Sequence, residues 1–115
     1  MRYYRIELVT EHQNKPEKAQ KLGKILAKNL HLEFISAKRY SKFDSSYRIS
    51  LKGVFPEDEN PFHHSLKIVS NIVSDWTTHY HPDNEKLELI FNKNVHSKFQ
   101  EQAYNTIIWG QFVME

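Results

Sequence analysis

The sequence predicts an α+β fold with a mostly antiparallel sheet and its helices on one face. Segments in which apolar and polar residues alternate, as strands require, are interrupted twice by segments with apolar residues every three or four positions, as helices require. Both helical segments are long enough to cross a sheet, whereas the second and third strands are separated by a short segment rich in turn formers.

The stretch from Ser45 to Trp76 is expected to supply the centre of the core. Its first part alternates, with Tyr47, Ile49, Leu51 and Phe55 on the buried side and Arg48, Ser50 and Lys52 on the exposed side. Pro56 should end this strand because it has no N–H to donate, and Asn60 followed by Pro61 predicts the start of a helix. The helix is expected to continue to Trp76 and to bury one face, formed by Phe62, Leu66, Val69, Ile72 or Val73, and Trp76.

The other elements follow from the same patterns. A first strand is expected over 2–10, a helix from Pro16 through Leu30, and a second strand over 32–40. After Trp76, residues 77–85 are interpreted as a polar segment with a turn at 82–84, followed by a strand over 87–92. A short helix over 97–104, with Phe99 and Ala103 inward, and a last strand over 106–114 complete the chain.

The first six elements follow a βαββαβ order, so the expected fold is a ferredoxin-like sandwich with an added C-terminal strand at one edge. The open face of its sheet would carry Tyr3, Arg5, Arg48 and Lys52. Gly23 lies inside the first helix, where glycine costs about 1 kcal/mol relative to alanine, and is expected to allow close packing on the sheet. Lysines form the outer stripe of that helix.

Composition limits the classes of function. A length of 115 residues predicts a single domain, 1–115, and 39% hydrophobic residues suffice for one core. A net charge of +2 is far below that of a dedicated nucleic-acid binder. The chain has no cysteine, no signal-peptide pattern and no apolar run of about 18 residues, so we expect a soluble, cytoplasmic protein without a membrane partner.

The seven histidines raise two possibilities. His79 and His81 would share one face of a strand near Asp83, but a zinc site needs three or four ligands, so we expect no metal and no cofactor. An RNase-like enzyme would need histidines as acid and base beside Arg48. The candidates are His12, His31, His79 and His96, whose mutual distances the sequence does not determine.

RNA binding is the other alternative, because the open face of a ferredoxin-like sheet can stack bases on aromatic side chains. The third strand would then carry an RNP-type motif with exposed aromatics. It reads Ser46-Tyr47-Arg48-Ile49-Ser50-Leu51-Lys52 instead, and Tyr47 has the parity of the buried face. Nucleic acid is therefore not the expected partner.

In its size and layout, and in having no catalytic motif, the whole chain resembles the bacterial immunity proteins of contact-dependent-inhibition and other polymorphic toxin systems. The resemblance implies a protein, not itself an enzyme, that neutralises a cognate toxin domain, often a nuclease, by binding it. Acidic side chains attract a basic partner and aromatics anchor it. The expected partner-binding residues are Glu57, Asp58 and Glu59, together with Asp44, Tyr40 and Phe43 of the loop between the second and third strands.

Overall fold

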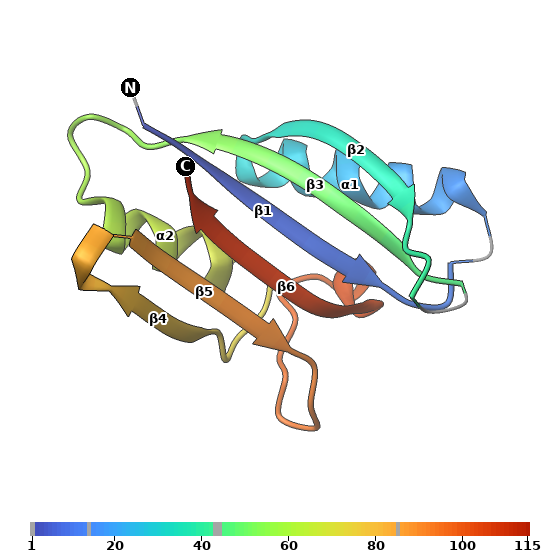
Figure 1. Cartoon of the computed structure of the whole chain (residues 1–115). Coiled ribbons are helices and arrows are strands. Elements are labelled where there is room, and N and C mark those ends of the chain that lie inside the picture. The colour runs from blue at the N-terminus through green and yellow to red at the C-terminus, as the bar shows by residue number, and fades with distance from the viewer. Residues whose placement is uncertain (1, 14, 43–44, 85) are drawn as a thin grey trace.

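Six strands form one antiparallel sheet, and two α-helices lie on one of its faces (Figure 1). The computed structural model describes residues 2–13, 15–42, 45–84 and 86–115. In chain order, the elements are β1 (Tyr3–Thr10), α1 (Pro16–Leu30), β2 (Glu33–Arg39), β3 (Tyr47–Val54), α2 (Pro61–Ser70), β4 (Thr77–His81), a 3₁₀ turn (Pro82–Asn84), β5 (Lys86–Asn92), a second 3₁₀ turn (Gln102–Tyr104) and β6 (Ile107–Met114). The α+β class is confirmed, but the helices and strands begin in the order βαββαββ, because strand β4 precedes the strand expected over 87–92.

The strand order is β2-β3-β1-β6-β5-β4, which differs from a ferredoxin-like sheet. The C-terminal strand was expected at an edge. Instead β6 pairs with β1 along most of its length, from Tyr4↔Met114 to Thr10↔Ile107, and β4 forms the far edge. The physical reason is that β4, β5 and β6 pair antiparallel with one another in chain order, which brings the apolar β6 to the centre.

The two helices bury the face of the sheet on which they lie. The α1 helix packs on β2 and β3, and Gly23 permits the contact, because a Cβ atom there would lie 2.5 Å from the Phe34 ring and 3.1 Å from Ile49. The α2 helix begins at the cap residue Asn60, whose side chain accepts a hydrogen bond from the His63 N–H. Among the described residues, neither helix is long and apolar enough to cross a membrane.

The expected extension of α2 to Trp76 is wrong, because the helix ends at Ser70. Its sheet-facing residues are His64, Ser65, Ile68 and Val69, while Phe62 and Leu66 are exposed, contrary to expectation. Beyond the helix, Val73 forms a β-bridge with Phe99, and the Ser74 N–H donates to the Lys98 carbonyl. These long-range hydrogen bonds replace the helical ones and carry the chain away from the helix axis.

Trp76 still packs on the core, although no helix carries it. Its indole N–H donates to the Val73 carbonyl at 3.0 Å, and its ring lies against Phe91. The ring occupies the space beside Gly110 on β6, where a Cβ atom would lie 2.6 Å away. The missing side chain of Gly110 therefore provides the room for Trp76.

Two other expectations were wrong in detail. Part of the polar segment 77–85 is strand β4, whose five residues pair with β5 although all are exposed. Of the short helix expected over 97–104, only Gln102–Tyr104 forms a helical turn; Phe99 packs against the core, but Ala103 is exposed and Tyr104 is buried. In both cases tertiary pairing outweighed local polarity.

Leu51 tests the core assignment. It is fully buried in β3, so we expect Leu51→Ala to lower the free energy of unfolding by about 2–5 kcal/mol through the cavity it leaves. Urea denaturation followed by circular dichroism measures this difference. Lys24→Ala, on the exposed side of α1, is the control and should change stability by less than about 0.5 kcal/mol. Equal stability of the two variants would contradict the assignment.

Candidate functional site

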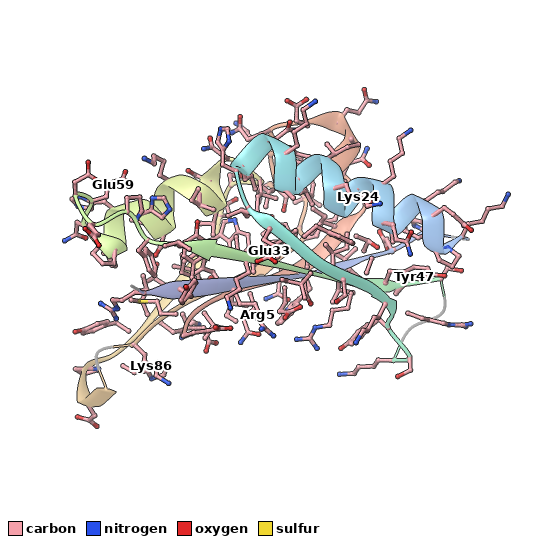
Figure 2. All side chains as sticks on the ribbon, turned by 90° about the horizontal axis from the view of Figure 1, so that it is seen from above. Arg5, Lys24, Glu33, Tyr47, Glu59 and Lys86 are labelled. Atoms are coloured by element: carbon pink, nitrogen blue, oxygen red, sulfur yellow. The ribbon has the colours of Figure 1, made fainter. Side chains whose placement is uncertain are left out.

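In the part of the chain that the structure describes, one face of the sheet is not covered by a helix. Figure 2 shows both helices on the same side of the sheet and Arg5 projecting from the opposite side. The register places the expected residues Tyr3 and Arg5 of β1 and Arg48 and Lys52 of β3 on this open face, as predicted. The neighbouring strand β6 adds Trp109, Gln111 and Val113, which pair with Val9, Glu7 and Arg5.

The centre of the open face is a charged cluster around Glu7. The Glu7 side chain is largely buried although it faces away from the helices. It accepts hydrogen bonds from the Arg48 Nε at 3.3 Å and from the Ser50 hydroxyl, and an Arg5 nitrogen lies 3.9 Å away. Hydrogen bonds to a charged acceptor are the stronger kind, so Glu7 holds Arg48 in one orientation across the β1–β3 pair.

A hollow of about 440 Å³ lies next to this cluster, at the end of the open face. Its apolar part consists of Val9, Ile108 and Trp109, and the half-buried indole of Trp109 is the largest of these side chains. The polar lining residues are Tyr40, Lys42, Arg48 and Asn92. The hollow therefore combines an aromatic surface with two cationic side chains.

A β-bulge in β6 creates the apolar side of this hollow. Trp109 pairs with Val9, but the next residue of β1, Thr10, pairs with Ile107, so Ile108 is the extra residue. A bulge of this kind re-aims side chains. Both Ile108 and Trp109 line the hollow as a result, whereas Ile107 is fully buried in the core.

Sequence reasoning did not assign Trp109 to a site. A signal was available, because Phe112 and Met114 have the parity of buried residues, which places Gln111 and Trp109 on the other face. The bulge that adds Ile108 carries no such signal. Tyr40 was among the expected partner-binding residues, and it does line the hollow.

Tyr40 and the expected acidic residues 57–59 do not form one patch. Tyr40 precedes β3, whereas the acidic residues follow it, so the eight residues of β3, about 26 Å of extended chain, separate them. Figure 2 shows this separation, with Glu59 and Tyr47 at opposite ends of the molecule. Phe43 and Asp44 lie outside the described residues.

The three acidic residues also differ from one another. Glu57 and Asp58 are exposed, but the Glu59 carboxylate accepts hydrogen bonds from the Lys67 ammonium and, at 2.8 Å, from the His64 Nδ1–H. These two bonds, that from Lys67 first, lower the pKa of Glu59 below its usual value. Glu59 therefore serves the fold, whereas the side chains of Glu57 and Asp58 are exposed.

The other ring nitrogen of His64 contacts the buried phenol of Tyr4, at 3.1 Å. The Tyr4 hydroxyl and Nε2 are hydrogen-bonded to each other, which completes a carboxylate–imidazole–phenol chain. Both nitrogens are thus used inside the protein, and neither is left to exchange a proton with a substrate. The chain satisfies the buried hydroxyl of Tyr4.

The remaining histidines do not converge on one site. His12 precedes α1 and His31 follows it, so a helix about 22 Å long at 1.5 Å per residue lies between them in the chain, while His79 is on β4 and His96 lies between β5 and β6. Within the described ranges there is no group of three or more His, Cys, Asp or Glu side chains that could hold a metal ion. An RNase-like site built from these histidines is not favoured.

Comparisons with protein-family models, with curated proteins and with solved structures found no match. The open face and its hollow are therefore interpreted from their own chemistry.

Tyr4 provides a test of the buried chain. Burial, and second the Glu59 carboxylate, raise the pKa of Tyr4 to about 12, whereas an unfolded tyrosine titrates near 10. Between pH 10 and 12 the unfolded chain has lost a proton that the folded protein keeps, so the contribution of this phenol to stability falls as the pH rises through that window. Tyr4→Phe should remove a late tyrosinate step from the ultraviolet titration of the folded protein.

Tyr80→Phe is the matched control, because it changes an exposed tyrosine of β4 and should keep the late step. A wild-type titration without any step above pH 11 would contradict the assignment.

Proposed function

We propose that the protein is an immunity-type binding protein, which neutralises a cognate toxin domain in the cytoplasm by binding it through the open face of the sheet. The observation that carries this proposal is the hollow in which Trp109, Tyr40 and Arg48 converge. These are the three residue types that most often dominate the energy of protein–protein interfaces. They come from β6, from the end of β2 and from β3, so the fold rather than one loop brings them together.

The site is suited to binding because its parts are already ordered. Arg48 is held by Glu7, and Trp109 is half-buried against a β-bulge, so both lose little side-chain freedom when a partner docks. An apolar side chain of the partner would occupy the surface formed by Val9, Ile108 and Trp109. The hollow is large enough for such a side chain.

Charge favours an acidic group on the partner at this point. Lys42 and Arg48 line the hollow, Arg48 being paired with Glu7, and no acidic side chain does so among the described residues. This differs from the expectation from sequence, in which acidic residues contact a basic nuclease. Glu57 and Asp58, at the far end of β3, could contact a second, basic region of the same partner.

RNA binding is the second candidate, and the same observation supports it. An uncovered sheet face with Trp109 and Tyr40 beside Arg48 and Lys42 has the two ingredients of a single-strand binding surface, stacking and positive charge. The positive charge is limited, because Arg48 is paired with Glu7 and Arg5 with Glu115 at 3.0 Å. We therefore place the protein partner first.

The test uses the product of the neighbouring gene, which the proposal expects to contain the toxin domain. Its expression should stop bacterial growth, and co-expression of the wild-type chain should restore it. Trp109→Ala should weaken the affinity measured by calorimetry at least tenfold, with the melting temperature changed by only a few degrees, because a hot-spot aromatic contributes about 2 kcal/mol or more. The paired variant Glu57→Ala with Asp58→Ala measures the contribution of the acidic loop in the same assay.

The control is Lys24→Ala on the helix side, which should bind like the wild type. A neighbouring gene product without toxicity, or full rescue by Trp109→Ala with unchanged affinity, would count against the proposal. Salt-dependent binding to single-stranded RNA that Trp109→Ala abolishes would favour the second candidate instead.

A further inference from the structure

The two edges of the sheet are built differently. The edge strand β2 carries Glu33, Lys38 and Arg39, and its register shifts between Phe34 and Ser36. Charged residues and a bulge are the usual means by which proteins prevent an edge from pairing with another strand. This edge is therefore protected.

The edge strand β4 has none of these features. It reads Thr77-Thr78-His79-Tyr80-His81, contains no Lys, Arg, Asp, Glu or Pro, and pairs with β5 through five consecutive residues without a register shift. All five residues are exposed, and β4 has one neighbour in the sheet. Its outer backbone groups are consequently open to a further strand.

Exposed apolar side chains accompany this edge on the helix side. Tyr80 pairs with the buried Leu87 and so faces the helix layer, where it is 59% exposed. Phe62 and Leu66, which are 43% and 37% exposed, lie one turn apart on α2. The other flank of α2, with Lys67 and Asn71, shares a hollow with the end of α1, so the helix period places Phe62 and Leu66 on the flank away from α1.

We infer that β4 is a self-association edge, which pairs antiparallel with the β4 strand of a second copy about a two-fold axis at His79. This interface is independent of the proposed toxin-binding site. In this register, Thr78 of one copy faces Tyr80 of the other, and Thr77 faces His81, so no like charges from Lys, Arg, Asp or Glu oppose each other.

Self-complementarity is the reason to choose a second copy over another partner. A two-fold axis places the same patch on both sides of an interface, so the patch must fit itself. Strand β4 without Lys, Arg, Asp or Glu and the apolar flank of α2 meet this requirement. Across the two-fold axis, the strand then lies opposite an equally uncharged strand, and the apolar side chains lie on the same side as those of the second copy. The association would join two six-stranded sheets into one.

Sedimentation of the full chain tests the inference. The 13.8 kDa monomer should convert to a species of twice that mass over roughly 10 μM to 1 mM, as expected for a small interface. The double variant Thr78→Lys with Tyr80→Lys opposes like charges across the two-fold axis and should be monomeric throughout that range. Ile35→Lys, which also replaces an exposed edge residue, but on β2, is the matched control and should dimerise normally.

Variants of opposite charge at Thr78 and Tyr80 test both that the partner is a second copy and that the two β4 strands pair in the proposed register. Thr78→Glu with Tyr80→Glu should also be monomeric alone, and an equimolar mixture of the Glu and Lys double variants should associate, because opposite charges then face each other. A wild-type chain that stays monomeric up to about 1 mM would overturn the inference, as would dimers of both double variants. A monomeric wild type whose toxin binding is lost in the Lys variant would assign β4 to the toxin and overturn it as well.

Discussion

The pairing of β1 with β3 and β6 is the constraint on which the rest of the structure depends. Without β1, the sheet would separate into β2-β3 and β6-β5-β4, since no other strand joins the two parts. Both faces of its second half are buried: Ile6 and Leu8 lie against the helix layer, and Glu7 and Val9 lie on the open face. The pairing also brings the chain ends together, because the Glu115 N–H donates to the Tyr3 carbonyl.

The same pairing explains two close contacts that tolerate little change. Tyr4 lies opposite Gly53, and its ring crosses the glycine, where a Cβ atom would lie 2.2 Å from the ring. The phenol can then reach His64 on α2, which links β1 to the second helix and to Glu59. A buried hydroxyl needs a hydrogen-bond partner, so the position of α2 and the conformation of the acidic loop are coupled to β1.

The open face follows from the distribution of the helices. Both cross on one side of the sheet (Figure 2). The polar groups of the central strands on the other side must therefore find partners among themselves, as Glu7 does with Arg48 and Ser50. The hollow beside this cluster and the β4 edge are separate surfaces, since β5 lies between β6 and β4. One partner on the open face and a second copy at the edge could therefore bind together.

The sequence by itself determined the elements that a local pattern predicts. These are the alternation in β1, β3 and β5, the β-forming residues of β6, the start of α2 at Asn60 and the packing role of Gly23. Only the tertiary structure decided the end of α2, the existence of β4 and the central place of β6, because these depend on hydrogen bonds between distant segments. For the candidate site, parity could have placed Trp109 on the open face, and the loop position of Tyr40 was visible. Their convergence with Arg48 required the strand order and the bulge at Ile108, which no local pattern encodes.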